Sequence, residues 1–382
     1  MSLTHQKNLF SLPEQPTYLN GAYMSPQLRS VEAIGIKNLQ RKATPFEITP
    51  EDFFSEKEVL RDQFAQLIDA PDAQYVAIIP SVSYGIANAM KNIPFEQGDE
   101  IVVLEEQFPS NYYSWKELEA STGIHIVTIT APEIKEGRGS HWNKKIQAAI
   151  NSKTKCVAIP HIHWADGTIF DLKTIRTLTT QVGAYLIIDG TQSVGALPFS
   201  VTEFNPDALI CGGYKWLLGP YSLGVAYYRE RFHEGTPIEN NWMSHQGSDD
   251  FRNLVKYNLN FKDKAVRFDV GESSNFILTP MLSESIRQIN EWTPDGIQEY
   301  CKQISFEPLQ RLKEAGYFIE DELYRAHHLF GIYLKDISKM EAIQQRIKDA
   351  GIIVSYRGNA IRVSCYLYNT KEDIEKLISC FI

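Results

Sequence analysis

Short apolar runs alternate with amphipathic stretches between residues 75 and 230. The runs are rich in β-branched residues, which is typical of buried strands. The predicted strands are Tyr75–Ile79, Ile101–Leu104, Ile124–Ile129, Cys156–Ile159, Ala184–Ile188, Ala208–Cys211 and Val225–Tyr228. Between two of these runs, Leu172, Ile175, Leu178 and Val182 recur at helical spacing. This alternation predicts an α/β fold with a mostly parallel, seven-stranded sheet covered by helices on both faces.

The last hundred residues have a different pattern. The predicted elements are a strand at Leu329–Leu334, a helix at Met340–Ala350, a hairpin of Ile352–Tyr356 and Ala360–Ser364, and a helix that starts at Thr370. Thr370 and Asp373 have the spacing of a capping box. We therefore expect a large domain over residues 18–283 and a small α+β domain over residues 284–382, to which residues 1–17 are added.

The composition excludes several classes of protein. The chain has 382 residues, enough for two domains, and 38 Lys and Arg against 47 Asp and Glu give a net charge of −9. This balance gives no electrostatic basis for binding nucleic acid or an anionic membrane. The sequence shows neither a signal peptide nor an apolar run long enough to span a membrane. Its five cysteines are scattered, so a disulfide framework is not expected and a reducing cytoplasm is the predicted location.

Two chemically active residues follow neighbouring predicted strands. Asp189 comes directly after Ala184–Ile188, and Lys215 follows Ala208–Cys211 in the segment GGYKWLLG. Ligands of open α/β sheets bind beyond the carboxyl ends of the strands, so both side chains should reach the same crevice. A partly desolvated lysine becomes a nucleophilic amine that forms Schiff bases with aldehydes such as pyridoxal phosphate. That cofactor needs an acid beside its pyridine nitrogen, although a simple salt bridge would also explain the pair.

A phosphate site and an aromatic platform are also predicted. Tyr75–Ile79 runs into the segment 80–85, PSVSYG, where free amides at a helix start and the hydroxyls of Ser81 and Ser83 form an anion cradle. Phe108 follows another predicted strand and would lie flat against a planar ring, or serve as ordinary core. Each of these signals is weak alone, and they gain weight beside Asp189 and Lys215.

The ordered set of motifs resembles the class V aminotransferase family, within the fold-type I pyridoxal-phosphate enzymes. That group includes cysteine desulfurases, selenocysteine lyase, kynureninase and isopenicillin-N-epimerase-like proteins. The motifs span most of the chain: YLNGAYMSP, PSVSYGIANAM, EEQFPSNYYSW, HIHWADGT, IIDGTQSVG, GGYKWLLGP, FDVGESSNF and RVSCYLYNTKEDIEKL. No single motif is specific, but the whole set in this order is.

The resemblance implies a role for each matching residue in binding pyridoxal 5'-phosphate. Lys215 would form the Schiff base and carry protons, Asp189 would pair with the pyridine N–H, and Gln192 would touch the ring hydroxyl. The remaining cofactor contacts would be Phe108 on the ring, with Val82, Ser83 and Tyr214 at the phosphate. Ser273 or Ser274 falls where relatives supply a phosphate ligand from a second subunit, which implies a homodimer with shared active sites.

The substrate side follows from the same resemblance. Arg362 matches the arginine that grips the substrate α-carboxylate with its two-pronged guanidinium. Trp164 is expected to line the pocket, and Ala22, in the N-terminal turn with Asn20 and Tyr23, to face the substrate. The expected partner is therefore a small amino acid.

The reaction type is less defined. Cysteine desulfurases carry a nucleophilic cysteine shortly before this arginine, whereas the stretch GIIVSYRGNAIRVS has none. Cys365 would lie on the other face of its strand, so persulfide chemistry is disfavoured. We expect a class V aminotransferase, with an epimerase or lyase of the kynureninase and selenocysteine-lyase kind as the alternative.

Two other classes compete with a cofactor-dependent enzyme. His161 and His163 have the spacing of a metal-ligand pair on one strand face, which would fit a metallohydrolase, but further ligands are lacking and no metal is expected. A relative that kept the fold only as an interaction module would tend to lose the lysine or its acid. The chain retains both Lys215 and Asp189.

Overall fold

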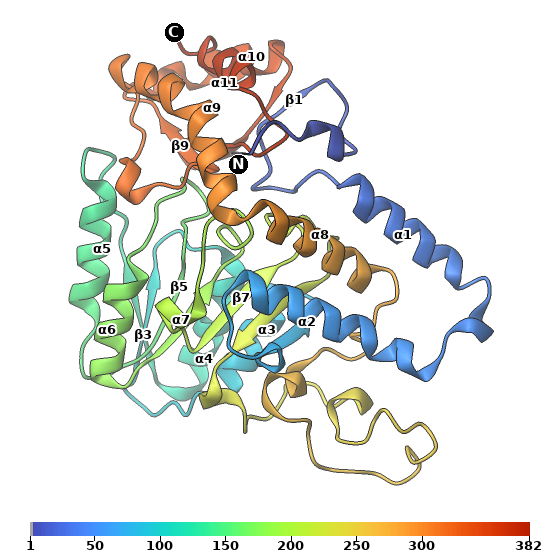
Figure 1. The fold of residues 1–382 in the computed structure, drawn as a ribbon. Coiled ribbons are helices and arrows are strands. Elements are labelled where there is room, and N and C mark those ends of the chain that lie inside the picture. The colour runs from blue at the N-terminus through green and yellow to red at the C-terminus, as the bar shows by residue number, and fades with distance from the viewer. Residues whose placement is uncertain (1–2) are drawn as a thin grey trace.

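The computed structural model describes residues 3–382, and a seven-stranded sheet forms its centre (Figure 1). In spatial order the strands are β2 (Val76–Ile79), β8 (Gly224–Tyr228), β7 (Ala208–Gly212), β6 (Tyr185–Asp189), β5 (Thr154–Pro160), β3 (Glu100–Leu104) and β4 (His125–Ile129). Strand β8 runs antiparallel to both neighbours, and the other pairs are parallel. The predicted α/β fold is confirmed, with small shifts at the strand ends.

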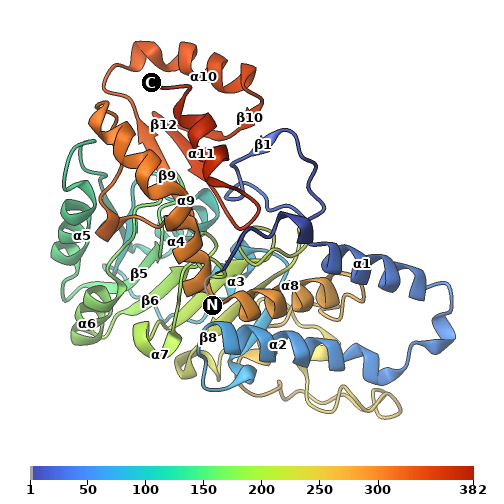
Figure 2. The same ribbon diagram turned by 45° about the horizontal axis from the view of Figure 1, so that its top comes forward.

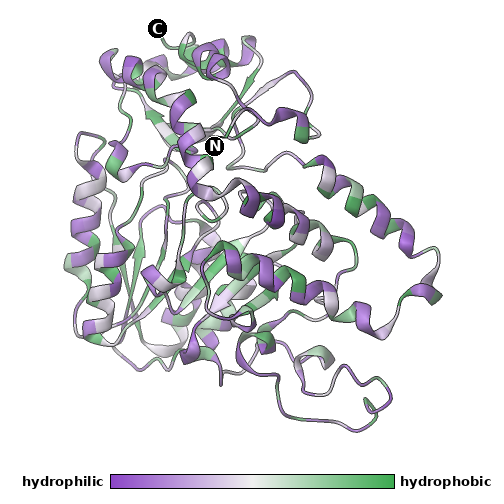
Figure 3. Ribbon diagram, in the orientation of Figure 1, coloured by the Kyte–Doolittle hydropathy of each residue, from purple (hydrophilic) through white to green (hydrophobic). Residues whose placement is uncertain are grey.

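Alternate side chains of each strand enter two apolar clusters, one on each face of the sheet. On β7, Leu209 and Cys211 belong to one cluster, and Ala208 and Ile210 belong to the other. Helices α2 (Ser55–Leu67), α5 (Arg138–Ala149), α6 (Leu172–Val182) and α8 (Leu278–Trp292) cover the first face. Helices α3 (Val82–Lys91) and α4 (Tyr113–Thr122) cover the second. The helices carry apolar and polar stripes, as amphipathic helices on a sheet must (Figure 3).

A smaller unit lies beyond one end of the sheet, at the top of Figure 1. Its antiparallel sheet has the order β11 (Ser355–Arg357), β12 (Ala360–Ser364) and β9 (Leu329–Tyr333). Helices α9 (Pro294–Glu314), α10 (Met340–Asp349) and α11 (Lys371–Ile378) accompany it. Helix α11 begins with the predicted capping box, because the hydroxyl of Thr370 and the carboxylate of Asp373 each accept from the other's backbone amide.

The N-terminal segment pairs with this smaller unit. Strand β1 (Thr17–Tyr18) runs parallel to β10 (Ile352–Ile353), on the same side as α10 and α11 (Figure 2). The predicted strand Ile352–Tyr356 is therefore wrong as a single element: its first half pairs with β1, and its second half begins β11. Local periodicity does not reveal this division, because the partner of β10 comes from the other end of the chain.

Helix α8 joins the two units and packs against α1 (Arg29–Arg41) and α2. The predicted boundary between residues 283 and 284 falls inside this helix. The chain turns at Thr293, between α8 and α9, where φ is +61°; the domain boundary itself stays a prediction. Helix α7 (Val201–Phe204) is a single short turn before β7. Among the described residues, no helix has the length and apolar character needed to cross a bilayer.

Candidate active site

Lys215 lies in a tight loop that follows β7. A Cβ on Gly213 would come 2.6 Å from the carbonyl oxygen of Leu223, to which the Gly213 amide donates a hydrogen bond of 2.9 Å. Only glycine allows the two backbone segments to approach so closely. Leu218 and Ser222, further along the same loop, have φ values of +56° and +68°, which costs about 1–2 kcal/mol per residue. The loop is therefore strained, and it holds Lys215 in a defined place.

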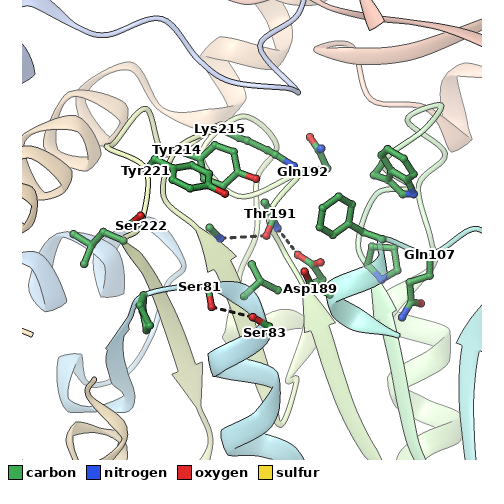
Figure 4. A pocket seen from close by; sticks show the side chains of 18 of the residues that line it. Ser81, Ser83, Gln107, Asp189, Thr191, Gln192, Tyr214, Lys215, Tyr221 and Ser222 are labelled. Atoms are coloured by element: carbon green, nitrogen blue, oxygen red, sulfur yellow. Dashed lines mark hydrogen bonds between the residues drawn. The ribbon is translucent and has the colours of Figure 1, made fainter. Parts of the chain in front are cut away.

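The Lys215 side chain is buried and points into a cavity of about 280 Å³ (Figure 4). Its Nζ lies 5.2 Å from the ring centroid of Phe108 and 5.4 Å from that of Tyr214. Burial lowers the pKa of Lys215 to about 8; the negative charge of Asp189 opposes this shift, and Arg362 and Arg357 add to it. About a tenth of the amine is thus uncharged at pH 7, far more than for an exposed lysine, whose pKa is about 10.4, and this uncharged form is the nucleophile.

Asp189 is the last residue of β6 and lines the same cavity. Strand β6 pairs with β7, so the sheet brings Asp189 and the Lys215 loop to one edge, as the sequence predicts. The Asp189 Oδ1 accepts a hydrogen bond of 3.0 Å from the Thr191 amide. Burial raises the pKa of the Asp189 carboxyl above its usual range, while the Thr191 contacts and Lys215 act in the opposite direction. A buried carboxyl of this kind is well placed to share a proton with a basic ligand atom.

The turn between β2 and α3 forms a cradle for an anion. Ser81 caps α3 by accepting from the Tyr84 amide at 3.3 Å, and its Oγ lies 3.0 Å from the Oγ of Ser83. Val82 and Ser83 belong to the first turn of α3, where amides lack intrahelical acceptors and the helix dipole favours negative charge. The rings of Tyr214 and Tyr221 face the cavity from above, with centroids 4.7 Å apart.

Two aromatic residues, Phe108 and Trp164, line another side of the cavity. Phe108 follows β3 and packs edge to face with Trp164, with ring centroids 5.5 Å apart. The Trp164 Nε1 donates to the Glu106 carbonyl at 2.6 Å, which fixes the indole. Gln192 lines the cavity as well; its amide donates to the Ala22 carbonyl at 3.1 Å and accepts from the Trp216 Nε1 at 2.9 Å. One amide N–H of Gln192 remains for a ligand.

A second cavity of about 310 Å³ adjoins the first and shares Phe108, Trp164 and Lys215 with it. Ala22 and Tyr23, together with Arg357 and Arg362 of the smaller unit, form its other walls. The Arg362 guanidinium is buried and donates to the Trp164 carbonyl at 2.9 Å and the Ser355 hydroxyl at 3.3 Å. Burial lowers the pKa of Arg362 to about 9, and the nearby charge of Arg357 acts in the same direction. Asn20 lies behind this cavity, where its Oδ1 accepts from Ser355 at 2.7 Å.

Ser273 and Ser274 lie elsewhere and line neither cavity. Both are buried: the Ser273 hydroxyl lies 3.2 Å from the Lys57 Nζ, and that of Ser274 donates to the Phe53 carbonyl at 2.6 Å. In this arrangement neither hydroxyl faces the surface. Their contact with a second subunit's phosphate stays a prediction, to which the geometry adds nothing.

The two histidines of the metal alternative have separate surroundings. His161 packs against Phe199 and Phe204, whereas His163 packs against Trp142 and lies 3.3 Å from an oxygen of Asp166. No group of three potential metal ligands occurs within residues 3–382. The hypothesis of a metallohydrolase therefore has no support in this geometry.

Sequence reasoning missed several residues of the site, among them Tyr221, Thr191 and Arg357. Thr191 accepts a hydrogen bond of 3.2 Å from the Gly212 amide, and so links the ends of β6 and β7 directly below Lys215 (Figure 4). Its place in the segment IIDGTQS, between Asp189 and Gln192, was the available signal. Arg357 was treated only as part of a hairpin turn, although it lies opposite Ala360 and shares a strand face with Arg362.

These features match the needs of pyridoxal phosphate. The site combines a buried amine, a buried acid, an anion cradle at a helix start and an aromatic wall around one cavity. Gly212 lines this cavity, and a Cβ there would contact Tyr214, Thr191 and Val82 at 3.3–3.6 Å, so the absence of a side chain leaves additional space at the cavity wall. The residues present therefore fit this cofactor.

Comparisons with known proteins agree with the geometry. The chain is 26% identical over 328 residues to an uncharacterized aminotransferase, YcbU, of Bacillus subtilis, covering 84% of this chain and 82% of that protein. It is 29% identical over 325 residues to a probable cysteine desulfurase of Staphylococcus aureus, covering 78% and 71%.

Solved structures have the same fold. The cystine C–S lyase C-DES, in complex with its product cysteine persulfide, superposes with a TM-score of 0.84 at 18% identity, with 98% of each chain covered. A cysteine desulfurase from Thermococcus onnurineus gives a TM-score of 0.81 at 19% identity, with 99% and 97% covered. The sequence profile of aminotransferase class-V matches residues 50–377. The resemblance found in the motifs is thus confirmed: the chain belongs to the aminotransferase class-V family of pyridoxal-phosphate-dependent enzymes.

Proposed function

We propose that this protein binds pyridoxal 5'-phosphate at Lys215 and acts on an α-amino acid, with transamination as its main reaction. The observation that carries the proposal is the shared cavity of Lys215 and Asp189, with the anion cradle of α3 at one end. When bound, the cofactor supplies an electron sink for the bonds at the substrate's α-carbon. The protein supplies binding, orientation and proton transfer.

Each residue has a distinct task in this proposal. Lys215 would hold the cofactor through its Nζ, because its lowered pKa leaves part of the amine uncharged near neutral pH, and the same Nζ would carry a proton during turnover. Asp189 holds the cofactor's ring nitrogen protonated, and its own position is fixed by the Thr191 amide. Gln192 uses its remaining N–H on the ring hydroxyl. Phe108 excludes water from one face of the ring.

Arg362 fixes the substrate. Its guanidinium is buried in the wall of the second cavity, and its Nε has no acceptor among the described residues. A carboxylate bound there would receive two parallel hydrogen bonds and would place the α-carbon toward Lys215. Trp164 and Ala22 would confine the rest of the substrate, because both line the same cavity.

The positions of the cysteines argue against a cysteine desulfurase activity. All five lie in the described residues, all are buried, and none lines either cavity. Cys365 is three residues from Arg362, but its thiol contacts the His327 carbonyl at 3.5 Å and does not face the substrate side. A persulfide carrier must reach the substrate's sulfur, so we favour transamination over desulfuration.

A lyase reaction is the second candidate. It is supported by the structural likeness to the cystine C–S lyase C-DES, which covers nearly the whole chain. An epimerase remains a further variant of the same site chemistry, because loss of the α-proton is the first step in each case.

A spectroscopic experiment separates these reactions. The purified protein, saturated with pyridoxal phosphate, is incubated with single amino acids while its visible spectrum and products are followed. Transamination converts the cofactor to its amine form and releases a 2-oxo acid in equal amount, and an added 2-oxo acid restores the spectrum. Release of sulfide, ammonia with pyruvate, or the D-amino acid would instead identify elimination or epimerisation. A protein that takes up no cofactor would overturn the proposal.

We further propose that the protein is a homodimer. Large apolar side chains are exposed on α1, on α2 and in the loop before Lys264, all on the right side of Figure 1; examples are Leu39, Val59, Val255, Tyr257 and Leu259. Several large apolar side chains exposed on one side of a chain favour a protein interface there. Light scattering at several concentrations should give twice the 43.6 kDa chain mass, and a monomer at all concentrations would contradict the proposal.

A further inference from the structure

Two arginines of the small sheet face the substrate cavity together. Strands β11 and β12 pair in register, with Ser355 opposite Arg362 and Arg357 opposite Ala360. Arg357 is two residues from Ser355, so its side chain leaves the same face of the sheet as that of Arg362. Both guanidinium groups lie against the Trp164 ring, at 5.3 Å for Arg357 and 5.9 Å for Arg362. The two cations are thus diagonal neighbours over one indole.

Neither arginine is neutralised by the protein. The Arg357 guanidinium donates to the carbonyl of its neighbour Tyr356 at 2.7 Å, and Arg362 donates to a carbonyl and a hydroxyl. The Nε atoms of both are buried and lack an acceptor within residues 3–382. The walls of this cavity contain Lys215 and both arginines, but neither Asp nor Glu. Arg362 is buried and Arg357 is half-buried, and cations that are withdrawn from water without an acidic partner are unfavourable, so the site is suited to receive negative charge.

One substrate carboxylate does not account for this charge. Asp189 is placed for the cofactor's ring nitrogen, and the cofactor's phosphate belongs at the start of α3, at the other end of the first cavity. The α-carboxylate uses Arg362. Arg357 then remains beside the space in which the substrate's side chain must lie, with an Nε donor that no acceptor occupies within residues 3–382.

We propose that Arg357 binds a second acidic group, on the substrate's side chain, so that the enzyme's substrates are dicarboxylic α-amino acids and the matching 2-oxo diacids. The inference rests on the proposed function and adds its substrate class. Aspartate and glutamate represent this class. Alanine and 2-aminobutyrate have similar chains without the second acid.

Comparison of Arg357→Gln with the unmodified protein tests the inference. We expect the unmodified enzyme to prefer aspartate or glutamate over the neutral pair by about 100-fold in kcat/KM, the effect of one well-placed charged hydrogen-bonding group. In Arg357→Gln, kcat/KM for the acidic substrates should fall by about 10- to 100-fold, mostly because KM rises. For the neutral substrates, kcat/KM should change by less than about threefold. Arg357→Lys should restore part of the loss, because the charge is kept and the fork is lost. The exposed Arg311→Gln, on α9 and outside both cavities, is the matched control and should leave kcat/KM for all four substrates unchanged.

A binding measurement removes the dependence on turnover. Succinate and butyrate do not react, so their affinities can be measured by calorimetry on the protein with and without cofactor. Succinate should bind at least about tenfold more tightly than butyrate, and Arg357→Gln should abolish that difference while butyrate binding persists.

The possible results separate two failures. If Arg357→Gln weakens neutral and acidic substrates equally, the two arginines share the α-carboxylate and the inference is wrong. Equal kcat/KM for alanine and aspartate in the unmodified enzyme would also overturn it, while the proposed function would stand. If no amino acid changes the cofactor spectrum, and succinate still binds through Arg357, the proposed function fails and the diacid site remains.

Discussion

The two sides of the candidate active site are built differently. The side formed by the large sheet has balanced charge, because Asp189 and Lys215 line the same cavity. The first-turn amides of α3 are free to bind an anion. The side formed by the small sheet has two arginines and no acid. On the large-sheet side, the charges of Asp189 and Lys215 balance each other, because this side is proposed to hold a cofactor whose charged groups are always the same. The small-sheet side leaves positive charge uncompensated, so the substrate has to supply the negative charge.

Lys215 lines both cavities, and charged residues of both sides shift its pKa. Burial lowers that pKa to about 8, Asp189 raises it, and Arg362 and Arg357 lower it further. The comparison therefore makes opposite predictions for the two sides: loss of the acid should make the amine less basic, and loss of either arginine should make it more basic.

Lys215→Ala should have the largest effect, because it removes the amine on which both sides act. We expect loss of the visible absorbance of the bound cofactor and a fall in kcat of about 100- to 10,000-fold, the usual contribution of a positioned proton carrier. Absorbance spectra with and without borohydride treatment, followed by peptide mass mapping, provide the check. A visible band that borohydride still fixes to the variant would place the attachment at another lysine.

Asp189→Asn breaks the balance of the large-sheet side without a change of size. The asparagine oxygen can still accept from the Thr191 amide, but it no longer holds the ring nitrogen protonated. We expect kcat to fall by about 100-fold or more, since a buried ionic partner is removed. Stopped-flow measurement of the half-reaction with a single amino acid tests this. A variant with unchanged kcat would show that Asp189 is only structural.

The pH dependence of cofactor attachment sharpens the comparison. Because the folded-state pKa of Lys215 lies below that of an exposed lysine, the uncharged amine increases as pH rises through about 8. Attachment of pyridoxal phosphate to the cofactor-free protein should accelerate by about 100-fold between pH 6 and pH 9 and then level off. In Arg357→Gln the midpoint should move upward, because a positive neighbour is gone. A rate that still rises steeply near pH 10 would show an ordinary, solvated lysine.

Arg362→Lys should have the smallest effect of the four. It keeps the positive charge of the small-sheet side but loses the planar fork that a carboxylate matches. KM for every amino acid should rise about tenfold, the worth of one charged hydrogen bond, while the cofactor spectrum stays unchanged. Steady-state kinetics on one acidic and one neutral amino acid measure this. A rise confined to the acidic substrate would exchange the roles assigned to Arg357 and Arg362.

The same two sides differ in how far the sequence predicts them. The residues of the large-sheet side could be predicted because they lie at or just after strand ends: Asp189 ends β6, Lys215 follows β7 and Ser83 follows β2. In a parallel sheet these ends meet at one edge, so local patterns translate directly into a site. The seven strands were found for the same reason, since each is a compact apolar run.

The small-sheet side depends on pairings that local patterns do not encode. A role for Arg357 in the site can be inferred only from its pairing with Ala360, which places it diagonally to Arg362 on one face of the sheet. The division of the strand at Ile352–Tyr356 depends on β1, whose two residues are too few to show the alternation of a strand. The inward orientation of Ser273 and Ser274 likewise follows from contacts with Lys57 and Phe53, which are distant in the chain.

The pairing of β1 with β10 has a consequence for biosynthesis. The Ala22 amide donates to the Ser364 hydroxyl at 2.9 Å, and the Ser364 amide donates to the Leu19 carbonyl at 3.0 Å, so an early segment closes the pocket only through residues translated near the end. During synthesis the large sheet can fold first, but the nascent chain cannot assemble its substrate wall until β12 has left the ribosome. A ribosome-bound intermediate arrested before residue 352 should therefore bind pyridoxal phosphate but fail to turn over any amino acid.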